Sequence, residues 1–119
     1  MLRDANSFSH IYLRCGRTDM RLGIDGLLTV ISSSMGLDPT QPGSIFLFCG
    51  HRKDRIKALI FEGDGWLLCY KRLTGDGSYQ WPRNENEARL ISGQQFRWLM
   101  EGLSIEQKKV IKDTKPDIY

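Results

Sequence analysis

The sequence predicts an α+β domain, in which an N-terminal strand and helix and a C-terminal helix pack against a small antiparallel β-meander. Three apolar runs rich in aromatic and β-branched residues follow one another at residues 44–49, 55–62 and 66–73, separated by short turns. Outside these runs, two segments repeat apolar residues every three or four positions, which is typical of helices with one buried face. Because the three strands are consecutive, we expect the helices to cover an antiparallel sheet.

The N-terminal part of the predicted domain is a strand followed by a helix. The strand covers residues 10–15, "HIYLRC". Thr18 and Asp19 then predict the start of the helix, because their side-chain oxygens can accept hydrogen bonds from the free N–H groups of a first turn. Gly36 is expected to end the helix in the left-handed conformation. Between these limits, apolar residues recur at helical spacing: Met20, Ile24, Leu27, Leu28, Ile31 and Met35.

Turn and cap residues mark the elements that follow. The "GDG" of residues 63–65 predicts a tight turn between the last two strands of the meander. Residues 83–89, "RNENEAR", are typical of a polar loop. Ser92 and Gln95 have the spacing of a capping box at the start of the second helix. The predicted buried stripe of that helix consists of Phe96, Leu99, Met100 and Leu103.

We expect a single α+β domain over residues 1–103, because no linker, repeat or low-complexity segment divides this part of the chain. Residues 104–119 contain few apolar side chains, so we expect a polar tail that is weakly helical or flexible. Ser104 and Gln107 have the spacing of a further capping box.

The charge of the chain is mildly basic. It contains 17 Lys and Arg against 14 Asp and Glu, a net charge of +3, which permits an anionic partner without requiring one. Its longest apolar stretches are too short to span a membrane, and the opening "MLRDANSFSH" lacks the apolar core of a signal peptide. We therefore expect a soluble, cytoplasmic protein with no membrane partner.

The cysteines and histidines predict neither disulfides nor a metal centre. Cys15, Cys49 and Cys69 are odd in number and have no C-x-x-C spacing, so we expect reduced, mostly buried thiols. His10 and His51 are neither paired nor spaced like zinc ligands. No metal or other cofactor is expected.

A series of short motifs resembles one known family. The segment "TDMRLGIDGL", residues 18–27, resembles the opening of the small accessory protein of insertion sequences of the sixty-six family, the TnpB-type product of their second open reading frame. The resemblance continues in order through "LDP" (37–39), "GSIFLF" (43–48), "DRIKALIFEGDG" (54–65), "YKRL" (70–73), "WP" (81–82) and "EGL" (101–103). One departure is "FCGHRKDR", residues 48–55, where the family is usually richer in arginine.

This resemblance implies a bacterial mobile-element protein that acts beside a separate transposase subunit in DNA transposition. It implies no established catalytic activity. The partners that it implies are the transposase and a sister accessory protein of the same element.

A group of basic residues in the meander is the candidate DNA site. If Gly63 and Asp64 form a two-residue turn, Arg55 faces Arg72 and Lys57 faces Tyr70, so that these four side chains gather at one end of one sheet face. The alternative is that these charges are merely solvated and protect a sheet edge from aggregation. With the adjacent basic residues, the predicted contacts with duplex DNA are Arg52, Lys53, Arg55, Lys57, Tyr70, Lys71 and Arg72.

A second candidate site is a docking surface for a protein partner. It comprises the charged start of the first helix and one tryptophan: Thr18, Asp19, Arg21, Asp25 and Trp98. The alternative for the helix start is simple capping, with Asp25 paired to Arg21 one turn earlier. Trp98 lies off the apolar stripe of its helix and is expected to be exposed, whereas Trp66 and Trp81 are expected in or beside the core.

Catalysis is the least favoured interpretation. Transposition chemistry usually needs carboxylates that hold two metal ions, but the acidic residues here suit structural uses. Asp38 precedes a proline, and Asp64 and Asp76 lie in Asp-Gly turns. We therefore expect a non-catalytic accessory factor in DNA transposition with no catalytic residues. The alternatives are a docking adaptor without DNA contact and a metal-dependent nuclease.

Overall fold

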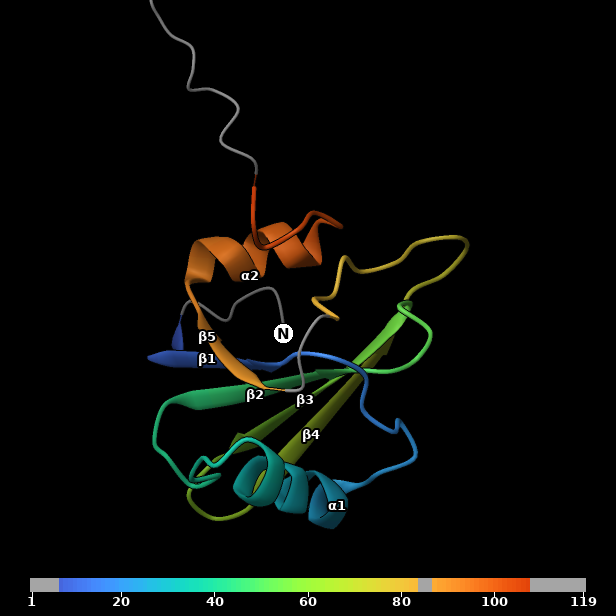
Figure 1. Cartoon of the computed structure of the whole chain (residues 1–119). Coiled ribbons are helices and arrows are strands. Elements are labelled where there is room, and N and C mark those ends of the chain that lie inside the picture. The colour runs from blue at the N-terminus through green and yellow to red at the C-terminus, as the bar shows by residue number, and fades with distance from the viewer. Residues whose placement is uncertain (1–6, 84–86, 108–119) are drawn as a thin grey trace, which may run out of the picture.

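The computed structural model describes residues 7–83 and 87–107. In this part of the chain a five-stranded sheet carries helices on both of its faces (Figure 1), which confirms the expected α+β class. The elements, in chain order, are β1 (His10–Arg14), α1 (Ile24–Thr29), the π-helical segment η2 (Val30–Ser34), β2 (Ser44–Cys49), β3 (Arg55–Phe61), β4 (Trp66–Arg72), β5 (Ala88–Ile91) and α2 (Gly93–Met100).

The strands are ordered β4-β3-β2-β1-β5 across the sheet. β2, β3 and β4 form the predicted antiparallel meander, and its register is confirmed: Arg55 lies opposite Arg72, and Lys57 lies opposite Tyr70. β1 pairs with β2 in parallel, so the sheet is mixed and mostly antiparallel. The long connection through α1 allows this pairing, because parallel neighbours need a crossover, which is usually helical.

The fifth strand corrects the end of the polar loop predicted over residues 83–89, because β5 includes Ala88 and Arg89. β5 pairs antiparallel with β1, with Leu90 opposite Tyr12 and Ile91 opposite Ile11. The segment before Leu90 is polar and short, so its own side chains give little strand signal. The strand forms because the free edge of β1 presents backbone N–H and C=O groups that need partners.

The first helix begins later than its cap residues predict. It starts at Ile24 instead of at Thr18 or Asp19. The Thr18 N–H donates to the carbonyl of Cys49 at 2.8 Å, so the backbone at this point is bonded to the end of β2 and cannot open a helix. Gly36, with a φ of 64°, follows the helical segments in the left-handed conformation, as predicted.

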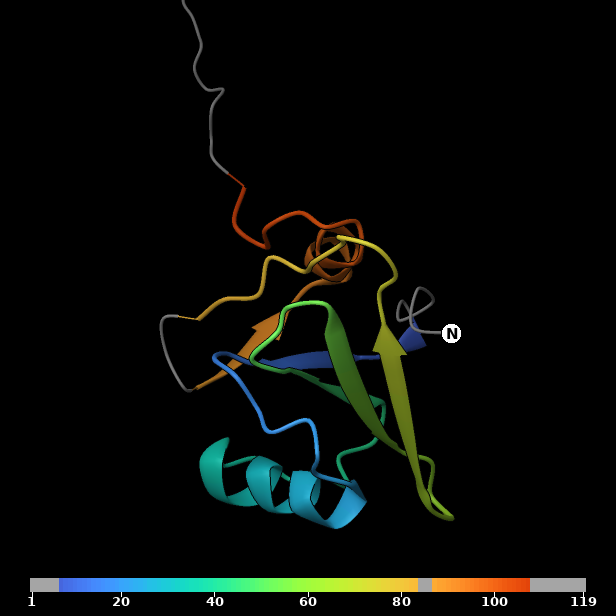
Figure 2. The same cartoon turned by 90° about the vertical axis from the view of Figure 1, so that its right-hand side faces the viewer.

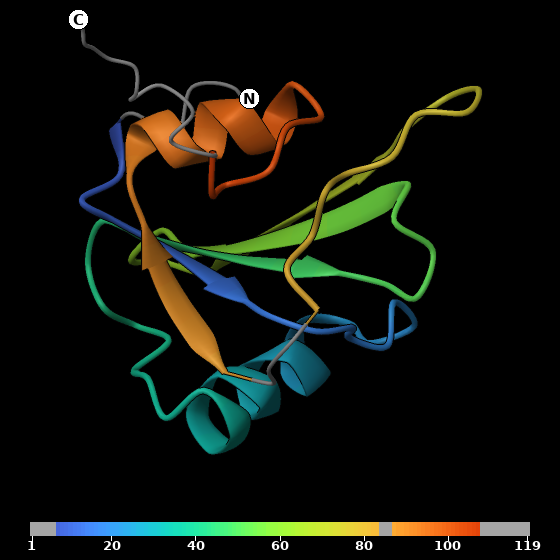
Figure 3. The same cartoon turned by 45° about the horizontal axis from the view of Figure 1, so that its top comes forward.

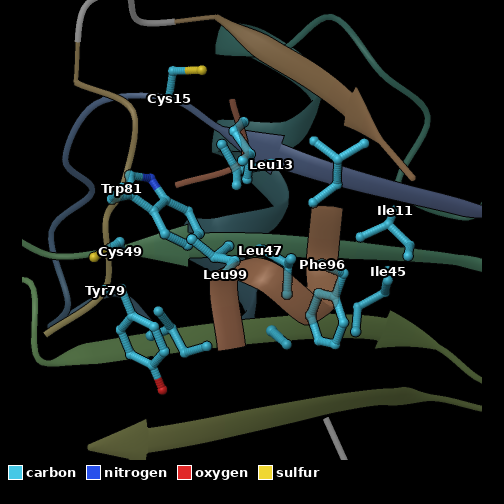
Figure 4. Close-up of a cluster of buried hydrophobic side chains, with 14 residues drawn as sticks. Ile11, Leu13, Cys15, Ile45, Leu47, Cys49, Tyr79, Trp81, Phe96 and Leu99 are labelled. Atoms are coloured by element: carbon cyan, nitrogen blue, oxygen red, sulfur yellow. The ribbon is translucent and has the colours of Figure 1, made fainter. Parts of the chain in front are cut away.

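Two apolar cores fill the space between the sheet and its helices. The core on the α2 side, shown in Figure 4, includes Leu13, Leu47, Trp81, Phe96 and Leu99. The core on the α1 side consists of Leu27, Ile31, Phe46, Phe48 and Leu59, with partly buried neighbours. β2 contributes to both cores. All six of its residues are therefore buried, which explains its continuous apolar sequence.

The start of α2 agrees with the sequence, whereas its end is shorter than expected. The Gln95 N–H donates to Ser92 Oγ at 3.0 Å, and the Ser92 N–H donates to Gln95 Oε1 at 2.8 Å, which confirms the capping box. Gly102, with a φ of 84°, follows the last turn. Because the helix ends at Met100, Leu103 does not continue its buried stripe and is 43% exposed.

The residues directly after α2 pack on the domain. Ile105 is only 3% exposed and belongs to the α2-side core. Ser104 and Gln107 form no capping box within the described chain; the Gln107 amide donates instead to the Ser104 carbonyl at 2.6 Å. The rest of the predicted tail, residues 108–119, lies outside the described residues. Within the described ranges, no helix has the length and apolar character needed to cross a bilayer.

Candidate nucleic-acid and partner interface

Most of the residues predicted to contact DNA lie near one corner of the sheet. The confirmed register puts four of them on the face that α1 covers, and we call them the basic corner: Arg55, Lys57, Tyr70 and Arg72. Arg72 is exposed, and Tyr70 is 53% exposed. Lys71 lies on the other face, because it pairs with Ile56 of the α2-side core. The structure therefore does not bring Lys71 to the basic corner.

The protein itself engages two cations of the basic corner. Arg55 Nε donates to the Asp54 carboxylate at 2.9 Å, and this hydrogen bond lowers the pKa of Asp54. Lys57 Nζ donates to the Leu22 carbonyl at 2.8 Å and lies 5.5 Å from the centroid of the Tyr70 ring. Lys57 therefore ties the segment before α1 to the sheet. Arg72 is the cation of this corner that is both exposed and outside the ion pairs of the described chain.

The loop between β2 and β3 adds two exposed cations, Arg52 and Lys53. Met20, from the segment before α1, packs over Gly50 at the base of this loop. A Cβ atom at position 50 would lie 2.5 Å from Met20 Cγ, closer than side-chain carbons approach one another. Gly50 is therefore suited to this close packing between the two segments.

The segment before α1 lies beside the β2–β3 loop, as can be followed in Figures 2 and 3. A hollow of about 480 Å³ lies between residues 17–21 and residues 50–52, with Arg55 also in its lining. Arg17 Nη1 lies 2.6 Å from His51 Nδ1 across this boundary. Arg52 and Arg55, which were predicted for DNA, thus lie beside residues 18–21, which include three of the predicted docking residues.

The predicted docking residues of the first helix have different environments. Thr18 is only 4% exposed, and its hydroxyl accepts a hydrogen bond from Arg14 Nη1 at 3.1 Å, so it supports the fold and offers little surface. Asp19 and Arg21 form an exposed ion pair at 2.9 Å. The Arg21 guanidinium lowers the pKa of Asp19 to about 2. Arg21 is therefore paired with Asp19 and not with Asp25, as the alternative interpretation had it, and Asp25 lies exposed in the first turn of α1.

Trp98 lies away from this surface. It belongs to α2, on the opposite side of the sheet from α1 (Figure 1). It is partly buried, whereas the sequence predicts exposure. Trp81 is buried and Trp66 is partly buried, as expected. The structure thus separates Trp98 from the other predicted docking residues.

Three arginines that the sequence did not single out lie at the same end of the sheet as the β2–β3 loop. Arg14 ends β1, Arg17 follows it, and Arg83 comes after the buried Trp81. Arg83 Nη2 donates to the Gly50 carbonyl at 2.7 Å. No regular spacing relates these positions, so only the basic character of each residue could have been noted from the sequence.

Cys49 and Asp38 have ordinary structural environments. Burial raises the pKa of the Cys49 thiol to about 11, which leaves little of the reactive thiolate at neutral pH. Asp38 accepts hydrogen bonds from the Thr40 N–H and hydroxyl at 2.9 and 2.7 Å, a local turn. Between residues 7 and 83 and between 87 and 107, no three His, Cys, Asp or Glu side chains gather as metal ligands would.

The chain is similar to known proteins along most of its length. The model of a family described as "IS66 Orf2 like protein" matches residues 9–110. The uncharacterized protein y4hO of Sinorhizobium fredii is 32% identical over 93 residues, which cover 78% of this chain and 79% of y4hO. The uncharacterized protein y4jC of the same organism is 32% identical over 100 residues, or 82% of this chain and 84% of y4jC. No solved structure shows a significant match.

Proposed function

Because this chain belongs to the IS66 Orf2-like family of transposition-associated accessory proteins, we propose that it assists the transposase of its insertion sequence without catalysis of its own. It acts through contacts with the transposase or a sister accessory protein, and through weak binding of duplex DNA. The family is not known to be catalytic. The second candidate function is a docking adaptor that makes no DNA contact.

The observation that carries DNA binding is the exposed positive charge at and beside the basic corner. Arg52, Lys53 and Arg72 are exposed, and none of them takes part in an ion pair of the described chain. Tyr70 exposes about half of its surface on the same corner, and an exposed aromatic ring can stack on a base. Phosphate contacts position a protein without reading sequence, so sequence specificity is assigned to the transposase.

Binding to a labelled duplex, measured by fluorescence anisotropy between about 50 and about 200 mM NaCl, tests this function. Four to six phosphate contacts should give a log–log salt slope of roughly −4 to −5. The double variant Arg52→Gln/Arg72→Gln removes two exposed cations. We expect it to lower the affinity at least about tenfold and to make the slope shallower by about 2.

A variant with the same loss of charge elsewhere serves as the control. Lys71→Gln/Arg97→Gln removes two cations from the other face of the sheet and from α2, and its affinity should stay within about threefold of wild type. Lys57 is left unchanged in both variants, because its hydrogen bond to the Leu22 carbonyl supports the fold. If the wild-type protein shows no salt-sensitive binding, the adaptor function alone remains.

Partner docking is supported by the ion pair of Asp19 and Arg21, which presents a guanidinium in a fixed orientation. The Arg21 side chain is 91% exposed, and arginine is enriched at protein interfaces. We expect Arg21→Ala to reduce capture of the element's transposase in a pull-down by about tenfold or more. The midpoint of urea unfolding should not change, because the side chain is exposed. If Arg21→Ala captures as much transposase as an Arg97→Ala control, Arg21 is not part of a docking site.

A further inference from the structure

A hollow of about 520 Å³ lies at the end of the sheet where the parallel strands β1 and β2 finish. Four of its lining side chains are arginine or lysine, and none is acidic. They come from three segments, namely the end of β1, the β2–β3 loop and the chain after Trp81, which converge in Figures 1 and 3. We call this site the cationic hollow, and its lining residues are Arg14, Gly16, Arg17, His51, Lys53 and Arg83.

Backbone hydrogen bonds hold the three segments of the cationic hollow together. The Gly16 N–H donates to the Pro82 carbonyl at 2.8 Å, and the Tyr79 N–H donates to the Lys53 carbonyl at 2.7 Å. Each bond joins positions distant in the sequence. The relative placement of the cations is therefore set by the fold and does not depend on a ligand.

Carbonyl groups orient the guanidinium groups without neutralising them. Arg14 Nη1 donates to the Arg17 carbonyl at 3.0 Å, and Arg83 Nη2 donates to the Gly50 carbonyl at 2.7 Å. A guanidinium has five N–H donors, so each keeps donors for another acceptor. Arg14 Nε is buried and has no hydrogen-bond partner in the described chain, although buried donors are normally paired.

The imidazole of His51 also lines the hollow and contacts Arg17. Arg17 Nη1 lies 2.6 Å from His51 Nδ1. Because a guanidinium can only donate hydrogen bonds, His51 Nδ1 is the acceptor in this contact. Arg17 is thereby held at the rim of the hollow.

The ion pairs of the described residues involve cations outside the cationic hollow. The ion pairs of the described residues join Asp19 to Arg21, Asp54 to Arg55, and Glu106 to Arg89. The four cations of the hollow take no part in them. Like charges fixed near one another repel, and an anion that accepts hydrogen bonds from several of them would relieve this repulsion. Arginine is well suited to phosphate, which it can bind through two parallel hydrogen bonds.

We propose that the cationic hollow binds a phosphate group. It shares Arg17 and His51 with the hollow beside residues 17–21. It shares Lys53 and Arg83 with a further hollow, which residues 104–106 also line. The cations therefore follow a path longer than one phosphate, which favours a nucleic-acid backbone over an isolated phosphate. Only the choice of a nucleic-acid backbone as the source of the phosphate rests on the proposed function.

The test compares two double variants of equal charge. Arg17→Gln/Lys53→Gln removes two exposed cations of the hollow and keeps the backbone hydrogen bond to the Lys53 carbonyl. For a labelled duplex at about 50 mM NaCl, we expect an affinity at least about 30-fold lower and a salt slope shallower by about 2. Lys71→Gln/Arg97→Gln, the control, should change the affinity less than about threefold. Urea unfolding establishes that both variants fold.

A second arm titrates inorganic phosphate and follows the backbone amide resonances of Gly16, His51 and Arg83. The site is supported if phosphate shifts these resonances in the wild-type protein but not in Arg17→Gln/Lys53→Gln, the hollow variant. This outcome supports the site even if duplex binding is absent and the DNA part of the proposed function fails. If the hollow variant loses duplex binding but inorganic phosphate causes no shifts in the wild-type protein, the site binds the phosphates of a nucleic-acid backbone and not free phosphate. If Arg52→Gln/Arg72→Gln weakens duplex binding but the hollow variant only matches its control, and phosphate causes no shift, the cationic hollow is overturned while the proposed function stands. The absence of any response to either ligand overturns both.

Discussion

Replacement of Phe46 by alanine is expected to lower the free energy of unfolding by about 3–5 kcal/mol, a large part of the stability of a domain of this size. Phe46 lies in the central strand β2 and is fully buried, at 0% exposure, in the α1-side core. Its ring stacks on that of Tyr12, with centroids 5.4 Å apart, a contact that adds to the effect of burial. The truncation leaves a cavity between the sheet and α1. Urea unfolding followed by circular dichroism measures the loss.

Leu90→Ala is the matched control for this prediction. Leu90 also lies in a strand, β5, but it is 59% exposed, so its truncation should cost no more than about 0.5 kcal/mol. Similar losses in the two variants would show that Phe46 is not enclosed as described. The α1-side core also includes Met20 and Leu22 as partly buried neighbours. We therefore expect the Phe46 variant to loosen the segment that carries the Asp19–Arg21 pair.

Trp81→Ala is expected to cost a similar amount, about 3–5 kcal/mol. The indole is only 3% exposed in the α2-side core (Figure 4), and its Nε1–H donates to the Arg14 carbonyl at 2.9 Å. Truncation removes this packing and leaves the Arg14 carbonyl without its donor. Because Trp81 anchors the segment that carries Arg83, the variant should also weaken duplex binding under conditions where it remains folded.

Trp81→Phe separates the two contributions of this residue. It keeps an aromatic ring in the core but removes the N–H donor, so we expect a loss of about 1–2 kcal/mol in the free energy of unfolding. Unfolding curves in urea for both Trp81 variants give the comparison. A loss below about 1 kcal/mol for Trp81→Ala would contradict the closed packing of residues 79–83 on the sheet.

Elements whose signals are local were predictable from the sequence. The two-residue turn at Gly63 and Asp64 determined the register of β3 and β4, because side chains alternate strictly across an antiparallel pair. The Ser92–Gln95 capping box located the start of α2, because both of its hydrogen bonds lie within a single turn. In each case the deciding contacts join residues close together in the chain.

Elements that depend on distant partners were not predictable in this way. β5 exists because the edge of β1 is free to pair with it, although its own sequence resembles a loop. The start of α1 is displaced because Thr18 bonds to the end of β2 and Lys57 bonds to the Leu22 carbonyl. These tertiary hydrogen bonds outweigh a capping preference of typically about 1 kcal/mol.

The candidate site also has one part that the sequence predicted and another that only the structure shows. The sequence identified the basic meander and placed Arg55, Lys57, Tyr70 and Arg72 together, and the structure confirms that placement. It could not show that Arg55 and Lys57 are engaged within the protein. Nor could it show that Arg14, Arg17 and Arg83 meet around one hollow, since their positions follow no common spacing.

The sequence by itself determined the α+β class, the meander with its register, and the family, because periodicity, turn residues and short motifs are written within contiguous stretches of chain. The tertiary structure alone decided which cations are paired, which are exposed, and which of them share a hollow. The physical reason is that charge acts through space. Its effect depends on separations, burial and partners that arise only when the crossover through α1 and the segment after β4 bring remote residues to one end of the sheet.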